Sequence, residues 1–173
     1  MTSSEPRPSD LPLPTFLVIG AQKAATRWLR HHLGPRDDVF CARWELSFFN
    51  DARRFAAGTD LYRRGFDGWR GEPVVGESTP GYLMWWHDPA QVAERIDATL
   101  PGVRLLAVLR DPVDRAQSAL VHHVRAERLP PSTRLPAHVR AVDPEHDRLG
   151  IVAGGWRARR PRPLPGAFRD PPL

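Results

Sequence analysis

The sequence predicts an α/β domain in which a parallel sheet is covered by helices on both faces, a three-layer α/β/α arrangement. Short apolar runs at 16–19, 74–77 and 103–109 have the nearly continuous hydrophobicity of strands that are buried on both faces. Helix-forming segments alternate with these runs, and this alternation is typical of a parallel sheet. The chain has 173 residues, 41% of them hydrophobic, which is enough for the core of one domain.

The first predicted unit is a strand followed directly by a helix. The apolar run at 16–19 is closed by Gly20, and the helix is expected from Ala24 to Leu33. Gly34-Pro35 ends it, because proline cannot continue a helix.

Two further strand and helix units complete the expected sheet. The run at 74–77 leads into a Ser-Thr-Pro-Gly turn, and the next helix begins at Asp88-Pro89, with Asp as the N-cap and Pro in the first turn. That helix ends at Pro101-Gly102. The strand at 103–109 has the strongest pattern in the chain, and Asp111-Pro112 opens a helix that runs to about residue 128.

The two ends of the chain differ from this domain, which we expect to cover residues 15–156. Residues 1–14 are polar and rich in proline, with no signal-peptide core, and are expected to be disordered. Residues 129–144 read as a surface loop, and 147–156 could begin another helix. The tail at 157–173 contains five arginines and five prolines, so no packed element is expected there.

Charge and composition narrow the possible functions. The net charge is +5, but residues 157–173 alone contribute +4, so the body is nearly neutral and nucleic-acid binding is not expected. No apolar stretch approaches the roughly 20 residues of a membrane helix, and we expect a cytoplasmic protein without membrane contact. The single Cys41 cannot form an internal disulfide, and no Cys/His spacing predicts a metal site. His31-His32 and His122-His123 are interpreted as solvated helix positions.

Lys23 is the single lysine among 24 arginines, and it lies where the first strand turns into a helix. Backbone N–H groups and the positive end of the helix dipole converge on such a turn, which favours a phosphate or a sulfate. The alternative is that arginine-rich codon usage left one lysine by chance. A Walker A loop would place Ser or Thr directly after the lysine, but Thr26 follows three positions later. A P-loop kinase is therefore disfavoured.

A second loop with anion-binding chemistry follows the strand at 103–109. It reads Arg-Asp-Pro-Val-Asp-Arg-Ala-Gln-Ser at residues 110–118. A guanidinium can donate two hydrogen bonds to one phosphate, and a serine hydroxyl can add a third. In a parallel sheet both loops lie at the edge where ligands bind. The alternative is a helix start with solvated charges.

Together the two loops resemble the PAPS-dependent sulfotransferases (PAPS, 3′-phosphoadenosine 5′-phosphosulfate), especially the branch with heparan sulfate sulfotransferases. Gly-x-x-Lys-x-x-Thr-Arg at 20–27 is similar to the family's 5′-phosphosulfate loop, which reads Lys-Gly-Gly-Thr-Arg or Lys-Thr-Gly-Thr-Thr, and residues 110–118 match its 3′-phosphate signature. The resemblance covers roughly 15–156 and implies a P-loop-like fold that is incomplete at its C-terminus. Here Ala24 and Ala25 replace the family's small pair, and we expect ordinary helical backbone at both.

The resemblance implies transfer of a sulfuryl group from PAPS to a hydroxyl or amine of a glycan or small-molecule acceptor, without a metal. In that role Lys23 neutralises charge on the bridging oxygen, while Arg110 and Ser118 hold the 3′-phosphate. The implied donor-binding residues are Gln22, Lys23, Ala24, Ala25, Thr26, Arg27, Arg110 and Ser118.

A third segment carries the implied catalytic base. Trp-Glu-Leu-Ser-Phe-Phe at 44–49 is similar to the family's Lys-Glu-x-His-Phe-Phe, which places Glu45 on the base that deprotonates the acceptor. We expect burial beside Phe48 and Phe49 to tune this carboxylate. The alternative is an exposed acid beside a pair of core aromatic residues.

The acceptor is not fixed by the sequence. Residues 76–82 resemble the family's acceptor segment Glu-Lys-Thr-Pro-x-Tyr, but three family cations are replaced, by Trp44, Ser47 and Ser78, which argues against a polyanionic heparan-type chain. Trp85-Trp86 could stack on a sugar or belong to the core. The abrupt change at 157 suggests a frameshift or a premature end, so the alternative function is an inactive remnant that binds only the nucleotide or a partner.

Overall fold

The computed structural model describes residues 7–84 and 87–134, and in them four parallel strands form one sheet. The order across the sheet is β2-β3-β1-β4. The strands are β1 (Phe16–Gly20), β2 (Val39–Cys41), β3 (Val74–Ser78) and β4 (Arg104–Ala107). The predicted parallel α/β sheet is therefore confirmed, with β2 as a strand that the sequence did not predict.

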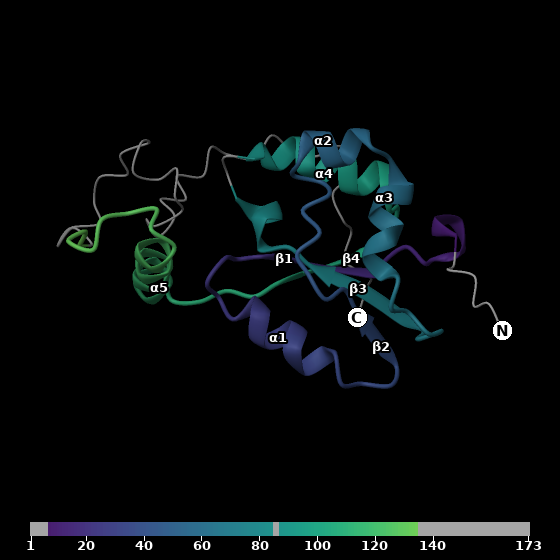
Figure 1. The fold of residues 1–173 in the computed structure, drawn as a ribbon, viewed down its shortest axis with the longest axis horizontal. Helices are drawn as coiled ribbons and strands as arrows, with labels where there is room; N and C mark the ends of the chain where they lie inside the picture. The colour runs from purple at the N-terminus through teal and green to yellow at the C-terminus, as the bar shows by residue number, and fades with distance from the viewer. Residues whose placement is uncertain (1–6, 85–86, 135–173) are drawn as a thin grey trace, which may run out of the picture.

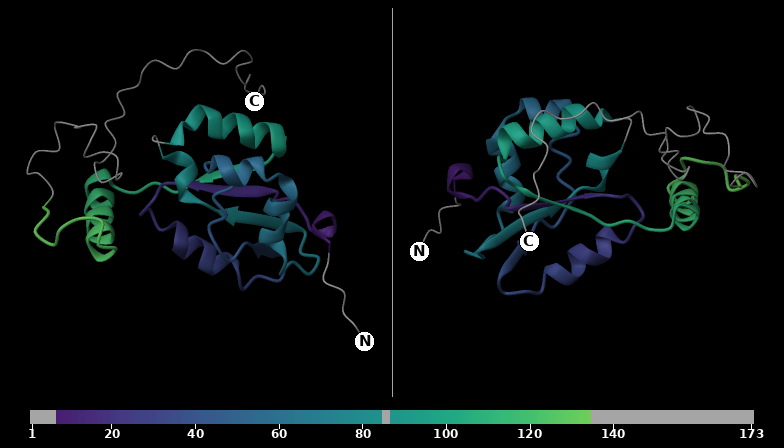
Figure 2. Two further views of the ribbon diagram at one scale, coloured as in Figure 1. Left: turned by 45° about the horizontal axis from the view of Figure 1, so that its top comes forward. Right: turned by 180° about the vertical axis from the view of Figure 1, so that it is seen from behind.

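Helices lie on both faces of the sheet. The helix α1 covers one face, whereas α2, α3 and α4 cover the other (Figure 1). A further helix, α5, stands beside the sheet and not on either face, and both views of Figure 2 show this separation. The helices are α1 (Thr26–Leu33), α2 (Ala52–Ala56), α3 (Thr59–Arg63), α4 (Pro89–Thr99) and α5 (Pro112–Arg125), with 3-10 turns η1 (Pro8–Asp10), η2 (Arg64–Phe66) and η3 (Pro80–Leu83).

Side chains that alternate along β1 build the two halves of the core. Leu17 is fully buried in the larger cluster, together with Tyr62 of α3 and Val92 of α4. Its neighbours Phe16 and Val18 point the other way and pack with the leucines of α1. This is the period of two that a strand imposes on its side chains, and it fixes β1 as the centre of the domain.

The strand β4 differs from the prediction. The sequence gives this strand the strongest pattern in the chain and predicts cover on both of its faces, yet Leu105 and Leu106 are 53% and 38% exposed. The reason is its place at the edge of the sheet, since within the described residues the helices cover the strands β1–β3. Burial on both faces is thus confirmed for β1 and is wrong for β4.

The N-terminal segment is more ordered than expected from residue 7 onward. Pro8–Asp10 forms the turn η1, and Leu11 is buried. The guanidinium of Arg63 donates a hydrogen bond to the carbonyl of Leu11, which ties the segment to α3. The helix expected at 147–156 and the tail at 157–173 lie outside the described residues.

Pairing between β1 and β4 extends beyond the strands and brings two loops together. The amide of Ala21 donates to the carbonyl of Val108 at 2.9 Å, and the amide of Val108 donates to the carbonyl of Gly20 at 2.7 Å. Since both strands run in the same direction, the loops that follow them start side by side at one edge.

Gly76 provides a test of this packing. A methyl group at this position would lie 2.2 Å from the ring of Phe16, so Gly76→Ala must displace the ring. We expect a loss of about 1–3 kcal/mol in the free energy of unfolding, measured with urea. The control is Gly34→Ala, because Gly34 has helical dihedral angles and its nearest neighbour lies at 3.6 Å. Equal destabilisation by the two substitutions would contradict the packing described.

Candidate functional site

The loop after β1 turns sharply before α1 begins. Lys23 and Ala25 have φ angles of 65° and 68°, in the left-handed region. The prediction of ordinary helical backbone is therefore wrong at Ala25, and α1 starts at Thr26 and not at Ala24. The physical reason is that the chain changes direction sharply between the strand and the helix. Residues in the left-handed backbone region make this turn, at a cost of about 1–3 kcal/mol for each residue that is not glycine.

The start of α1 is open to a ligand. Its N-cap, Ala25, offers no side-chain hydrogen bond to the first turn. By contrast, the side chains of Asp51, Asp88 and Asp111 accept backbone N–H groups at the starts of α2, α4 and α5. The first-turn amides of α1 thus keep their capacity to bind an anion.

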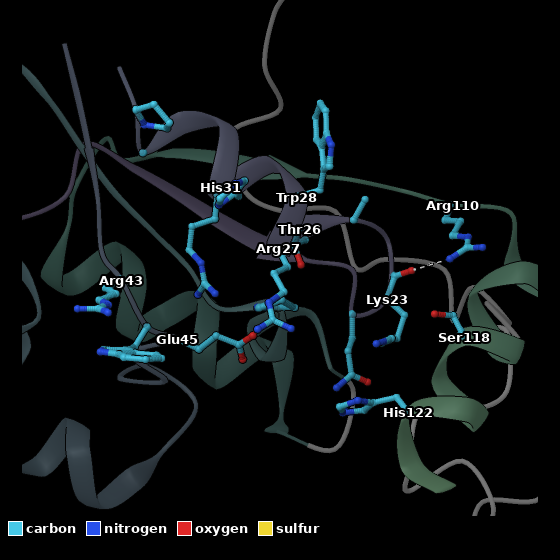
Figure 3. A pocket seen from close by; sticks show the side chains of 17 residues that line it. Lys23, Thr26, Arg27, Trp28, His31, Arg43, Glu45, Arg110, Ser118 and His122 are labelled. Carbon is cyan, nitrogen blue, oxygen red and sulfur yellow. Dashed lines mark hydrogen bonds between the residues drawn. The ribbon is translucent and has the colours of Figure 1, made fainter. Parts of the chain in front are cut away.

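The loop after β4 meets the Lys23 loop directly. The guanidinium of Arg110 donates a hydrogen bond to the carbonyl of Lys23 at 3.4 Å, across 87 residues of sequence (Figure 3). Asp111 then caps α5, which presents Ser118 two turns further along the helix. Two motifs that the sequence analysis identified separately are therefore joined by a contact.

The two loops border one open cavity of about 1320 Å³. Its lining takes in α1, the 43–45 segment that follows β2, and one side of α5 (Figure 3). Ala24 is the one predicted site residue that does not line the cavity, because its side chain is buried. The predicted residues that do line it are Gln22, Lys23, Ala25, Thr26, Arg27, Glu45, Arg110 and Ser118.

Glu45 lines the cavity but is not buried. Its side chain is exposed, whereas Phe48 and Phe49 point into the core. The expected burial of Glu45 beside these rings is therefore wrong, because the chain turns between residue 45 and residue 48 and separates the carboxylate from them. In Figure 3 the carboxylate points into the cavity, toward the side chain of Arg27.

His122 is a cavity residue that the sequence analysis assigned to solvent. It follows Ser118 by four positions, so both lie on the same face of α5, and this spacing was the signal that could have identified it. Partial burial lowers the pKa of His122, and the charge of Lys23 acts in the same direction.

The cavity lining also includes exposed aromatic and cationic side chains. Trp28 and Trp44 are 61% and 67% exposed. The guanidinium of Arg43 lies 5.3 Å from the ring centre of Trp44, and Arg30 also lines the cavity. Rings and guanidinium groups of this kind suit an acceptor with a flat face and polar edges.

The segment at 76–82 does not line the cavity as the resemblance implied. Pro80 alone among these residues is part of the lining, whereas Glu77, Thr79 and Tyr82 are buried. Burial raises the pKa of Glu77, and hydrogen bonds from Thr79, Tyr82 and Tyr62 oppose this effect. Trp85 and Trp86, the other expected acceptor residues, lie outside the described residues.

Two further findings concern residues 7–84 and 87–134. None of their helices combines the length and apolar character needed to cross a bilayer. No group of three or more His, Cys, Asp or Glu side chains in this part of the chain could hold a metal ion.

Comparison with known proteins returns sulfotransferases, although no family model matches the sequence. Human heparan sulfate glucosamine 3-O-sulfotransferase 6 is 33% identical over 151 residues, which are 85% of this chain and 39% of that protein. The membrane-associated sulfotransferase kil1 of Dictyostelium discoideum is 32% identical over 61% of this chain and 22% of its own length.

A solved structure agrees with these relatives. The sulfotransferase from Alicyclobacillus acidocaldarius superposes with a TM-score of 0.60 and 33% identity, over 70% of this chain and 54% of that one. The chain spans 22–39% of the length of the curated relatives it matches.

The buried carboxyl group predicts a pH dependence of folding. Because the pKa of Glu77 is raised above 4.5, the folded chain holds its proton at pH values where the unfolded chain has lost it. The stability that this group contributes is therefore present below about pH 4.5 and is lost as the pH rises through the folded pKa. Urea unfolding of the wild type and of Glu77→Gln between pH 4 and 7 measures this. A difference in stability that does not change with pH would contradict it.

Proposed function

We propose that this chain, which belongs to the sulfotransferase family, binds PAPS at the carboxyl edge of its sheet and moves the sulfuryl group to a hydroxyl or amine. The resemblance to sulfotransferases that the sequence predicted is confirmed by the relatives and by the fold. One observation carries the proposal for this chain's own site. The Arg110–Lys23 contact brings the two donor-binding motifs to one cavity.

The Lys23 loop fits the 5′-phosphosulfate. The uncapped start of α1 supplies backbone N–H groups, and Thr26 and Arg27 add a hydroxyl and a guanidinium beside them. The side-chain oxygen of Gln22 is buried here and has no hydrogen-bond partner among the described residues. That oxygen only accepts hydrogen bonds, so Gln22 would bind a phosphosulfate oxygen through its side-chain NH₂ group and not through this atom.

Arg110 and Ser118 fit the 3′-phosphate at the other end of the donor. Both line the same cavity, one at the end of the strand and the other on α5. Arg110 is exposed and its ion pair with Asp114 is long, at 3.9 Å, so its guanidinium can turn toward a phosphate at little cost. His122 lies on the same helix face and can add a charge when it is protonated.

The proposed reaction is an in-line transfer at sulfur. The acceptor oxygen or nitrogen forms a bond to sulfur while the bond from sulfur to the phosphate oxygen breaks, and that oxygen keeps the electron pair. Glu45 takes the acceptor's proton, and Lys23 offsets the charge that grows on the phosphate oxygen. We propose no metal for this step, because Lys23, Arg27 and Arg110 supply the positive charge.

For the acceptor we propose a glycan or a small molecule that carries a hydroxyl or amine. The exposed ring of Trp44 lies next to Glu45 in the sequence, lines the same cavity and can stack on a sugar. The names of several relatives refer to the glucosamine of heparan sulfate, which supports this class of acceptor. The cytoplasmic location stays a prediction, since one relative is named membrane-associated.

Binding of adenosine 3′,5′-bisphosphate tests the donor site without requiring turnover. Arg110→Ala removes a charge-assisted hydrogen bond, and we expect the Kd measured by calorimetry to rise by about 10- to 100-fold. The control is Arg125→Ala, which removes another exposed arginine, at the far end of α5. The absence of binding by the wild type would refute the proposed site in this chain.

Turnover of labelled PAPS tests the assignment of the base. Glu45→Gln keeps the size of the side chain but removes the proton acceptor, so kcat should fall by about 10²- to 10⁴-fold. Affinity for adenosine 3′,5′-bisphosphate should stay unchanged, because Glu45 is not assigned to the donor. The control is Glu94→Gln on the exposed side of α4. Wild-type rates in Glu45→Gln would exclude Glu45 as the base.

A further inference from the structure

A buried carboxyl group at the end of β3 collects hydrogen bonds from three hydroxyl groups. Glu77 has no exposed surface. Its Oε1 accepts from Tyr62 at 2.8 Å and from Tyr82 at 2.6 Å, and its Oε2 accepts from Thr79 at 2.6 Å. These donors come from α3, from η3 and from the turn between β3 and η3, so Glu77 connects three parts of the fold.

Two of these hydroxyl groups also hold the loop that carries Glu45. The amide of Ser47 donates to Thr79 Oγ1 at 3.2 Å, and the amide of Phe48 donates to the hydroxyl of Tyr82 at 3.1 Å. The loop is thereby attached to Glu77 through two consecutive amides, and the backbone of Leu46 also contacts the Glu77 carboxyl directly. In the described part of the chain, the Tyr62 hydroxyl has a hydrogen bond to Glu77 but none to this loop.

The attachments leave only a short span free around Glu45. On its N-terminal side the amide of Ala42 donates to the carbonyl of Gly76 at 2.8 Å. On its C-terminal side Ser47 is fixed in the left-handed region, with φ 50°. Between these points, residues 43–45 project into the cavity. Arg54 also donates a hydrogen bond to the carbonyl of Leu46 at 2.6 Å, so the position of the Glu45 carboxylate depends on how residues 46–48 are held.

We propose that Glu77 is a positioning residue for sulfuryl transfer. Through the hydroxyls of Thr79 and Tyr82 it fixes the loop at residues 43–48, and so it sets the place of Glu45 at the acceptor side of the cavity. Glu77 does not line the cavity, so it acts through the loop and not on the donor or the acceptor. This inference rests on the proposed function, in which Glu45 is the base.

Two tyrosine hydroxyls donate to the same oxygen of Glu77, and replacing each tyrosine by phenylalanine gives a matched pair of variants. Tyr62→Phe and Tyr82→Phe each remove one buried hydroxyl that donates to Glu77 Oε1, and each keeps its ring in the aromatic core. Only Tyr82→Phe also removes the acceptor for the amide of Phe48. Both variants should lower Tm, while only Tyr82→Phe should loosen the loop. The pair also avoids Glu77→Ala, which leaves three buried hydroxyl protons without an acceptor and can prevent folding.

The experiment compares amide hydrogen exchange, nucleotide binding and turnover in these variants and the wild type. In Tyr82→Phe we expect exchange at Phe48 to become at least tenfold faster and kcat to fall by about tenfold to a hundredfold, since small displacements of a catalytic group have effects of this size. Affinity for adenosine 3′,5′-bisphosphate should stay within twofold of wild type. Tyr62→Phe should keep wild-type exchange at Phe48 and wild-type kcat.

Equal losses of kcat in the two variants, or unchanged exchange at Phe48 in Tyr82→Phe, would overturn the positioning role. Failure of the proposed function gives a different result, because the wild type then binds no nucleotide. In that case the exchange comparison still decides whether Glu77 holds the loop.

Discussion

The arrangement of the site depends on the parallel pairing of β1 with β3 and β4. Since these strands run in the same direction, their carboxyl ends share one edge, and the Lys23 loop, the turn after β3 and the Arg110 loop are brought to it. The backbone bonds between Ala21 and Val108 extend this pairing to the loops themselves. The Arg110–Lys23 contact is thus a consequence of strand direction, and it brings an ammonium, a guanidinium and free helix amides to one cavity.

Two places along this edge carry an unfavourable local free energy. The Lys23 loop holds Lys23 and Ala25 in left-handed backbone, which an alanine adopts only at an energetic cost. Beneath the neighbouring loop, Glu77 is removed from water, and its burial is offset by the hydroxyls around it. Both loops follow strands that are packed in the core around Leu17. The core therefore determines where each loop begins at the cavity.

Features that depend on hydrophobic periodicity and on turn residues could be predicted from the sequence. The apolar run that becomes β1, the Asp88 and Asp111 helix starts and the meeting of the Lys23 and Arg110 loops at one sheet edge were all predicted. The environment of a side chain was harder to predict, because it depends on contacts that are distant in the sequence. Glu45 is exposed although it precedes two buried rings, and β4 is exposed although it is apolar.

The central claim is that the two loops bind opposite ends of one donor. A crystal structure of this chain with adenosine 3′,5′-bisphosphate tests it most directly. The account predicts the 5′-phosphate at the Lys23 loop, against the first-turn amides of α1, and the 3′-phosphate between Arg110 and Ser118. Nucleotide bound outside this cavity, or with its two phosphates exchanged, would contradict the account.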